Sequence, residues 1–336
     1  MGAGRRSGET GHYMRVAILE DYQKASPTLA CFAALAAHQV EVFSEPMRDE
    51  ATIAARVGDF EAIVVIRERT RITSSLIDRL PKLRLVVQTA KIGPHVDLEA
   101  CQARGITVCD GTGGPVSTAE LTWGLILASA RNIVAENIRV TRGQWQGSVG
   151  FSLQGKKLGL IGFGRIARIV ARYAAAFEMK VGVWGRDSTL QRAKAAGLAT
   201  AASLRELCAG SDVVSIHLRL APETRAIVKY EHLAAMGPEA MFVNTSRAEL
   251  VESGALERAL TGGRPGRAAL DVFENEPILA PGHPLAALPN VTATPHLGFV
   301  ERGNYEKYFG DAFDAVNAFA SGRPVRVVPR PQDRQR

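Results

Sequence analysis

The chain alternates between short, continuous apolar runs and longer stretches in which apolar residues return every three or four positions. Continuous runs bounded by turn residues are typical of strands buried on both faces, whereas the longer spacing is typical of helices with one buried face. Their alternation predicts an α/β fold with parallel sheets. The predicted strands are residues 15–19, 41–43, 62–66, 83–88, 158–161, 180–184, 213–217, 241–244, 268–271 and 291–294.

Three segments have the clearest helical pattern, and they are residues 27–37, 117–132 and 305–319. The second of them begins with Ser117 or Thr118 as a candidate N-cap and has Glu120 in its first turn, as in a capping box. We expect this helix to lead from a first α/β domain into a second one. The last helix is expected to return the chain to the first domain.

A glycine-rich turn follows the predicted strand at 158–161. Gly162, Gly164 and Ala167 occupy the three small positions of a G-x-G-x-x-G/A pattern, which lets a pyrophosphate approach the backbone at the start of a helix. The pattern alone is weak evidence, but a helix and the strand at 180–184 complete a βαβ unit around it. We therefore predict a dinucleotide site, with the backbone of Arg165 and Ile166 near the pyrophosphate.

The end of the strand at 180–184 bears on the choice of nucleotide. An acidic residue usually binds the ribose 2′-hydroxyl of NAD at this point, but here the position falls on Gly185 and is followed by Arg186. A guanidinium can bind a 2′-phosphate with two hydrogen bonds, which favours NADP slightly over NAD. The alternative stays open that Arg186 is solvated or stacks on adenine and that Asp187 serves as the acid.

Three polar residues follow predicted strands at the carboxyl edge, where open parallel sheets bind ligands. Arg247 follows the strand at 241–244, Glu276 follows the strand at 268–271, and His296 follows the strand at 291–294. Each one alone fits a solvated loop. Together, after a dinucleotide turn, an arginine, a carboxylate and an imidazole could bind and reduce a 2-oxo acid.

Composition narrows the function classes. The net charge of +7 does not indicate nucleic-acid binding, because much of it lies in the arginine-rich end of the chain and no basic stripe with interleaved aromatics occurs. The apolar stretch at 121–130 is far too short to cross a membrane. Cys31, Cys101, Cys109 and Cys208 have no metal-binding spacing, so we expect reduced thiols and no metal.

The chain resembles the D-isomer-specific 2-hydroxyacid dehydrogenase family from about Arg15 to Pro324. The segments that carry the resemblance are LGLIGFGRIA, LRLAPETRAIV, MFVNTSRAELV, ALDVFENEP and NVTATPHLG. It implies two Rossmann-like parallel-sheet domains with a cleft between them, one a flavodoxin-like substrate domain and one an NAD(P)-binding domain. We assign residues 14–115 and 299–325 to the substrate domain and 116–298 to the NAD(P)-binding domain, with a disordered leader at 1–13 and a basic tail at 326–336.

The resemblance also implies roles for individual residues. Arg247 matches the substrate-binding arginine, Glu276 its acidic partner, and His296 the general acid/base. The cofactor-binding residues it implies, together with those predicted above, are Gly162, Gly164, Arg165, Ile166, Gly185, Arg186, His217, Leu218, Thr245, Arg247, Asp271, His296 and Gly298. Asp271 is a candidate acceptor for the carboxamide nitrogen of the nicotinamide.

The substrate loop departs from the glycine-rich form usual in the family. Its residues include Lys91 and Ile92, whose backbone amides are candidates to bind the substrate carboxylate. Lys91 and Arg67 could add positive charge to an acid site or could be solvated, and Arg69 is a similar candidate. The identity of the 2-oxo acid therefore cannot be taken from any one relative.

The expected function is an NAD(P)-dependent D-2-hydroxyacid dehydrogenase acting on a small 2-oxo or 2-hydroxy acid. The alternative is a dinucleotide-sensing binding protein of the same fold without significant turnover. A formate dehydrogenase is disfavoured, because that subgroup lacks an acid at the position of Glu276. We expect a cytoplasmic homodimer, with the apolar helix at 121–130 and Trp145 as candidates for the contact.

Overall fold

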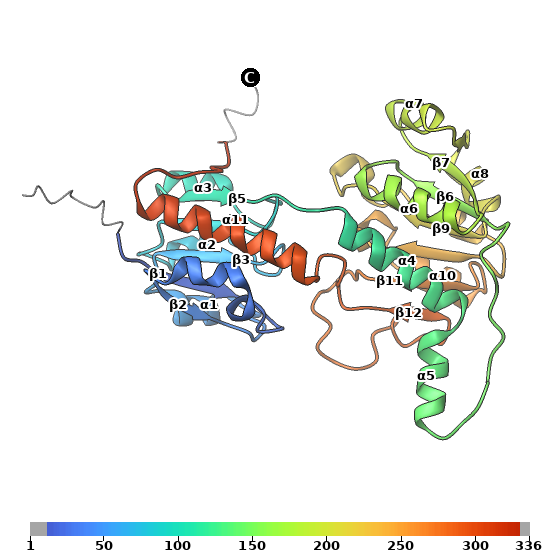
Figure 1. Cartoon of the computed structure of the whole chain (residues 1–336), viewed down its shortest axis with the longest axis horizontal. Coiled ribbons are helices and arrows are strands. Elements are labelled where there is room, and N and C mark those ends of the chain that lie inside the picture. Colours follow the sequence, from blue (N-terminus) through green and yellow to red (C-terminus); the bar gives the residue numbers. More distant parts are fainter. Residues whose placement is uncertain (1–11, 330–336) are drawn as a thin grey trace, which may run out of the picture. The chain divides into compact units, whose positions relative to one another are not determined.

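The computed structural model describes residues 12–329, so most of the predicted leader and much of the predicted basic tail lie outside the described residues. The chain divides into two compact units (Figure 1). Unit 1 contains the chain up to Gly114 and again from Glu301, and unit 2 contains Pro115–Val300. The chain therefore passes between the units twice.

Unit 1 is built on a five-stranded parallel sheet with the order β2-β1-β3-β4-β5. This is the flavodoxin-like order, in which successive strands are added on one side of β1 and then, from β3 onward, on its other side. Strands β3 and β4 are buried along their whole length because helices cover both faces of the sheet. The elements are β1 (Arg15–Leu19), η1 (Ser26–Thr28), η2 (Ala30–Leu35), β2 (Gln39–Val42), α1 (Glu50–Val57), β3 (Ala62–Val65), α2 (Ser74–Asp78), β4 (Leu85–Gln88), α3 (Leu98–Ala103), β5 (Thr107–Asp110) and α11 (Arg302–Ala320).

Unit 2 is built on a seven-stranded parallel sheet with the order β12-β11-β10-β9-β6-β7-β8. Strand β6 is central, and the order runs outward from it in both directions, as in the Rossmann fold. The helices are α4 (Val116–Ala130), α5 (Ile133–Thr141), α6 (Arg165–Ala176), α7 (Asp187–Ala195), α8 (Leu204–Ala209), α9 (Tyr230–Ala234) and α10 (Ala255–Thr261), with η3 (Pro222–Thr224) and η4 (Ala248–Leu250). The strands are β6 (Lys157–Ile161), β7 (Lys180–Trp184), β8 (Ala199–Thr200), β9 (Val213–Ile216), β10 (Met241–Asn244), β11 (Arg267–Leu270) and β12 (Val291–Ala293).

The two faces of the unit 2 sheet have separate hydrophobic cores. Helices α4 and α6 pack on one face through residues such as Ile126 and Val170. Helices α8, α9 and α10 pack on the other face through residues such as Leu207 and Leu256. Burial of both faces explains why these strands have continuous apolar sequences. The predicted α/β class with two parallel-sheet domains is confirmed.

Two local predictions were wrong. Residues 27–37 form two short 3-10 segments, η1 and η2, in place of one α-helix. Helix α4 has Pro115 at its N-cap and no side-chain cap, and Thr118, which already lies inside the helix, donates its hydroxyl to the carbonyl of Gly298 at 2.8 Å. The expected capping box is absent because the helix begins before Ser117.

Candidate active site and dinucleotide turn

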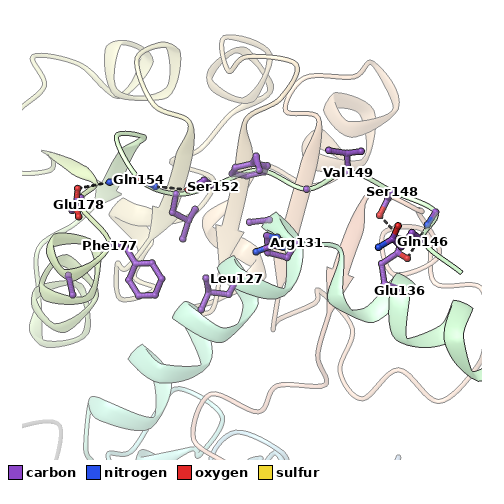
Figure 2. Close-up of a pocket in the computed structure, with 16 residues that line it drawn as sticks. Leu127, Arg131, Glu136, Gln146, Ser148, Val149, Ser152, Gln154, Phe177 and Glu178 are labelled. Carbon is purple, nitrogen blue, oxygen red and sulfur yellow. Dashed lines mark hydrogen bonds between the residues drawn. The ribbon is translucent and has the colours of Figure 1, made fainter.

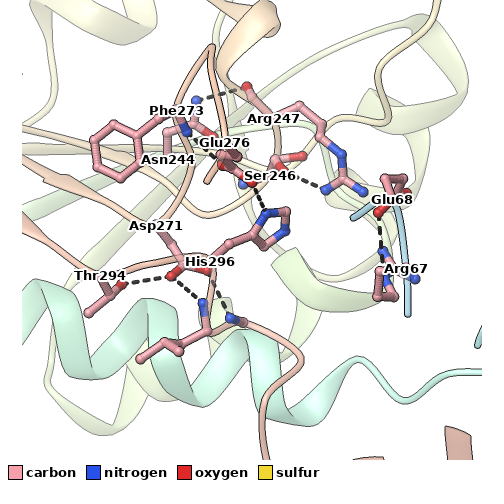
Figure 3. Close-up of polar contacts among 12 residues, drawn as sticks. Arg67, Glu68, Asn244, Ser246, Arg247, Asp271, Phe273, Glu276, Thr294 and His296 are labelled. Atoms are coloured by element: carbon pink, nitrogen blue, oxygen red, sulfur yellow. Dashed lines mark hydrogen bonds and ion pairs between the residues drawn. The ribbon is translucent and has the colours of Figure 1, made fainter. Parts of the chain in front are cut away.

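His296 and Glu276 form a direct contact in unit 2. The distance from His296 Nδ1 to Glu276 Oε2 is 2.5 Å, and Glu276 Oε1 accepts a hydrogen bond from the amide of Phe273 at 2.8 Å (Figure 3). The second contact fixes the carboxylate, which in turn orients the imidazole ring. Because Nδ1 is engaged with Glu276, Nε2 is the ring nitrogen left for proton exchange.

Asp271 holds the turn that carries His296. Its carboxylate is fully buried and accepts hydrogen bonds from Thr294 Oγ1 at 2.7 Å, the Leu297 amide at 2.6 Å and the Gly298 amide at 2.8 Å. Burial raises the pKa of Asp271, while these donors and the nearby His296 act in the opposite direction. The carboxylate thus ties the Thr294 side chain, before His296, to two backbone amides after it.

The loop after β10 places Arg247. Asn244, the last residue of that strand, donates from Nδ2 to the carbonyl of Arg247 at 2.9 Å and accepts from the amide of Ser246 at 2.9 Å. The Arg247 guanidinium donates to the carbonyl of Ser246 at 2.6 Å, and Figure 3 includes it in the same view as Glu276 and His296. A tight hydrogen-bonded loop therefore sets the direction of this side chain.

The two glycines of the turn between β6 and α6 differ in the space around them: Gly162 is enclosed by neighbouring atoms, and Gly164 is not. Gly162 has φ +91°, and a Cβ there would lie 2.7 Å from Leu218 Cδ2 and 2.9 Å from the carbonyl oxygen of His217. Gly164 is exposed, and a Cβ there would meet no atom within 4 Å. Gly164 is the N-cap of α6 and provides no capping side chain, so the amide end of the helix, beginning with Arg165 and Ile166, is suited to an anion.

The second strand of this βαβ unit ends beside two further predicted residues. A Cβ on Gly185 would lie 2.8 Å from Thr189 Cγ2, so the first turn of α7 approaches the backbone closely there. Arg186 is the exposed N-cap of α7, and Asp187 is the first residue of that helix. Both the cationic and the acidic candidates for the ribose are therefore at the carboxyl end of β7.

His217 follows β9, next to the glycine turn. Burial lowers the pKa of His217 to about 4, and its Nε2 lies 2.9 Å from Ser215 Oγ. The ring is therefore neutral near pH 7. The structure brings His217 and Leu218 against Gly162.

Sequence and structure comparisons identify the family. The family model described as D-isomer specific 2-hydroxyacid dehydrogenase, NAD binding domain, matches residues 123–298. A glyoxylate reductase from Aeropyrum pernix is 38% identical over 290 residues, which cover 83% of this chain and 86% of the relative. The crystal structure of a phosphoglycerate oxidoreductase from Vibrio cholerae superposes with a TM-score of 0.90 at 44% identity, covering 92% of this chain and 99% of that one.

The chain belongs to the D-isomer-specific 2-hydroxyacid dehydrogenase family. It is thus an oxidoreductase that uses a nicotinamide dinucleotide and acts on 2-hydroxy acids. Relatives differ in length: the D-3-phosphoglycerate dehydrogenase of Methanocaldococcus jannaschii is 35% identical over 77% of this chain, but the match spans only 49% of that relative. The dehydrogenase described here corresponds to about half of such longer proteins.

The remaining predicted substrate residues of this dehydrogenase lie in unit 1. Lys91 Nζ is 2.8 Å from Asp110 Oδ1, and the amide of Ile92 donates to Asp110 Oδ2 at 3.2 Å. Arg67 Nε is 3.6 Å from Glu68 Oε2, and the Arg67 amide donates to Thr89 Oγ1 at 2.9 Å. The Lys91 ammonium and the Ile92 amide thus share one nearly buried carboxylate within their own unit.

Sequence reasoning missed several residues that support the site. Thr118 and Thr122 are separated by four positions on one face of α4, and the Thr122 hydroxyl lies 2.7 Å from Thr245 Oγ1. Two polar residues at helical spacing within an apolar helix were the available signal. Their partners could not be deduced, because Thr245 and Gly298 are distant in sequence.

Between residues 12 and 329, no group of three or more His, Cys, Asp or Glu side chains is arranged to hold a metal ion. No helix in this part of the chain is both long and apolar enough to span a membrane.

Burial raises the pKa of Cys31, Cys101 and Cys208 to about 12 and of Cys109 to about 11, so these thiols are protonated near neutral pH.

Proposed function

We propose that His296 is the general acid/base of the dehydrogenase, that Glu276 orients it, and that Arg247 binds the substrate carboxylate. The contact between His296 Nδ1 and Glu276 Oε2 carries this proposal. A carboxylate that holds one ring nitrogen presents the other one for proton transfer. A guanidinium on the neighbouring strand's loop supplies paired donors for a carboxylate.

The proposed reaction converts a 2-oxo acid to a 2-hydroxy acid and the reverse. Bound nicotinamide supplies the hydride to C2 in reduction and accepts it in oxidation. In reduction, charged His296 donates its Nε2 proton to the ketone oxygen, so the product gains one hydride and one proton. In oxidation, neutral His296 accepts the hydroxyl proton at Nε2, and Glu276 stabilises the resulting charge.

The first substitutions to measure are His296→Ala and Glu276→Gln. Loss of general acid/base catalysis should lower kcat about 100-fold or more in His296→Ala, with a smaller loss in Glu276→Gln. The assay is reduction of glyoxylate, hydroxypyruvate and bulkier 2-oxo acids, followed by nicotinamide absorbance. Nucleotide affinity, measured by fluorescence titration, should fall far less than kcat in either variant.

Near wild-type turnover in His296→Ala would contradict the catalytic assignment. Nucleotide binding by the wild type without turnover of any 2-oxo acid would favour the dinucleotide-sensing alternative.

We propose small 2-oxo acids as the substrate class, with glyoxylate the first candidate because a glyoxylate reductase is among the relatives. Lys91, Ile92 and Arg67 are proposed as further substrate-binding residues. Asp110 supports this role for Lys91, because it anchors the ammonium while 72% of the lysine side chain stays exposed. The Ile92 amide would have to exchange its bond to Asp110 for one to the substrate.

We propose NADP as the slightly favoured nucleotide, with Arg186 as the ligand of the 2′-phosphate. Its exposed position at the N-cap of α7 supports this, since the amide end of that helix adds a favourable field for an anion. Arg186→Ala should then lower the ratio of kcat/KM for NADPH to kcat/KM for NADH about tenfold.

Lys194→Ala is the matched control for Arg186→Ala, because Lys194 is a cation in the last turn of the same helix. An unchanged ratio in Arg186→Ala, or a wild type that prefers NADH, would remove Arg186 from the site and favour Asp187 as the ribose ligand.

We propose that the dehydrogenase is a homodimer in which the arm formed by α5 and residues 142–152 contacts a second copy. None of the α5 residues is buried, and Ile133, Ile138 and Val140 expose 53%, 42% and 54% of their surface. Trp145 exposes 77%. By contrast, much of the predicted contact at 121–130 packs into the core of unit 2, so it is unavailable to a partner.

A hollow of about 1210 Å³ lies between the arm and the neighbouring part of unit 2 (Figure 2). Its lining combines Leu127 and Phe177 with Arg131 and Glu136, and Glu136 fixes the returning loop by accepting hydrogen bonds from the Gly147 amide at 3.1 Å and from Ser148 Oγ at 2.5 Å. An ordered arm with exposed apolar residues suits a self-complementary contact.

The cytoplasm stays the predicted location, which fractionation of expressing cells would test.

A further inference from the structure

The two passages of the chain between the units are cross-linked by a hydrogen bond inside unit 2. The chain enters unit 2 at Pro115 and leaves it after Val300. Thr118 Oγ1 donates to the carbonyl of Gly298 at 2.8 Å, so the bond joins one residue shortly after the entry to one shortly before the exit. His296 is two positions away from this carbonyl.

Gly298 is held from both sides. Its amide donates to Asp271 Oδ2 at 2.8 Å, and its carbonyl accepts from Thr118. A Cβ on Gly298 would lie 3.1 Å from Asp271 Oδ2 and 3.3 Å from Thr118 Cγ2, so the two side chains leave almost no free space around it. The end of the turn that carries His296 therefore has little freedom to shift.

The backbone of His296 needs such support. Its φ is +53°, in the left-handed region that a non-glycine residue adopts only at some cost in energy. The Asp271 carboxylate fixes the amides of the turn, but the carbonyl of Gly298 depends on Thr118. Without the Thr118 hydroxyl, this end of the turn would lose a bond and could relax toward a commoner backbone geometry.

The same face of α4 also reaches the segment before Arg247. Thr122 Oγ1 donates to the carbonyl of Thr118 at 2.7 Å, so its single proton is used there. The 2.7 Å contact with Thr245 must then be donated by the Thr245 hydroxyl. Helix α4 thus holds both segments that carry candidate site residues, and Thr118 is the contact nearest to His296.

We propose that Thr118 is a positioning residue for proton transfer: its hydroxyl fixes the Gly298 carbonyl and so keeps His296 aligned with Glu276 and the substrate. This inference rests on the proposed catalytic role of His296. It assigns to the helix a function in the reaction that its apolar sequence does not indicate.

The test compares Thr118→Val, which removes the hydroxyl at nearly constant shape, with Thr118→Ser, which keeps it. We expect Thr118→Val to lower kcat about tenfold, because small misalignments of reacting groups are costly, with little change in nucleotide Kd. Thr118→Ser should restore most of kcat. Thr261→Val is the matched control, since Thr261 Oγ1 also donates to a backbone carbonyl, that of Glu257 in α10, at 2.9 Å.

A second readout reports on the geometry directly. The imidazole N–H proton shared with Glu276 should give a downfield proton NMR signal, assigned by its absence in His296→Ala. That signal should shift or broaden in Thr118→Val and stay in place in Thr118→Ser and Thr261→Val. A purely structural role would lower Tm without moving the signal of the folded protein.

Unchanged kcat and an unchanged signal in Thr118→Val would overturn the inference, as would a loss of kcat that Thr118→Ser does not restore. If the wild type turns over no 2-oxo acid, the proposed function fails instead. The NMR comparison then still decides whether Thr118 positions the His296 ring.

Discussion

Four residues that follow the carboxyl ends of strands have left-handed backbone conformations without being glycine. They are Glu20 after β1, Arg67 after β3, Ala90 after β4 and His296 after β12, with φ values of +56°, +55°, +61° and +53°. Such conformations persist only where surrounding contacts impose them, and they cluster at functional loops. These conformations occur at the carboxyl edge of each sheet, where ligands are expected to bind. This supports a functional role for the loops at that edge.

His217 should make stability depend on pH. Its folded-state pKa of about 4 is below the ordinary value of 6.5, so the unfolded chain binds the proton more readily. The stabilisation is therefore complete above pH 6.5 and is lost as the pH falls toward 4. The expected loss at pH 5 is about 2 kcal/mol relative to pH 7.5.

Urea unfolding of the wild type and of His217→Gln at both pH values measures this dependence. The variant lacks the titrating group and should lose correspondingly less free energy of unfolding between pH 7.5 and pH 5. Equal losses in the two proteins would show that His217 titrates normally in the folded state.

The two glycines of the turn between β6 and α6, Gly162 and Gly164, have different roles. Gly162 lacks space for a Cβ and has positive φ, whereas Gly164 has extended backbone and open space. Gly162→Ala should therefore lower the free energy of unfolding by about 2 kcal/mol or more. Gly164→Ala should leave stability nearly unchanged but weaken nucleotide binding at least tenfold, because the methyl group blocks the approach of the pyrophosphate.

Thermal unfolding and nucleotide titration of the two glycine variants distinguish these effects. Full nucleotide affinity in Gly164→Ala would mean that the pyrophosphate does not contact this turn.

Helices α4 and α5 are consecutive but have opposite environments. Helix α4 is apolar on most sides and packs against α6 and the sheet, which explains its continuous hydrophobic sequence. Helix α5 has one apolar stripe, and no residue of it is buried within the chain. An amphipathic helix without an internal partner is expected to find an external one.

At the scale of the whole molecule, the arm should determine the oligomeric state. Ile138→Glu places a charge on the exposed stripe of α5 and should convert the proposed dimer to a monomer, because burying an unpaired carboxylate in an interface is costly. Sedimentation equilibrium at micromolar concentration measures the change. Val325→Glu is the control, since Val325 exposes 39% of its surface in unit 1, outside the arm.

A wild-type protein that sediments as a monomer would refute the dimer. A dimer that survives Ile138→Glu would place the interface elsewhere.

The sequence by itself determined the class of fold and the main chemical groups. Continuous apolar runs predict strands buried on both faces, and several predicted strands, such as 15–19, 180–184 and 241–244, coincide with β1, β7 and β10. The glycine turn identifies a dinucleotide unit, because close approach of backbone and pyrophosphate restricts residue types locally. Arg247, Glu276 and His296 could be named as candidates because each lies in the loop that follows a strand.

Only the tertiary structure decided how those groups are held. The contacts of Asp271 and Thr118 with the turn at His296, and of Asp110 with Lys91, join residues that are separated in sequence. From the sequence, Thr118 is predicted as a candidate helix cap, because a local pattern relates a residue only to its neighbours in the chain. Its bond to Gly298 could not be foreseen in this way. Hydrogen bonds between strand ends and a helix depend on the positions of these elements in space. Those positions are set by packing of the helix against the sheet, which the local sequence does not specify.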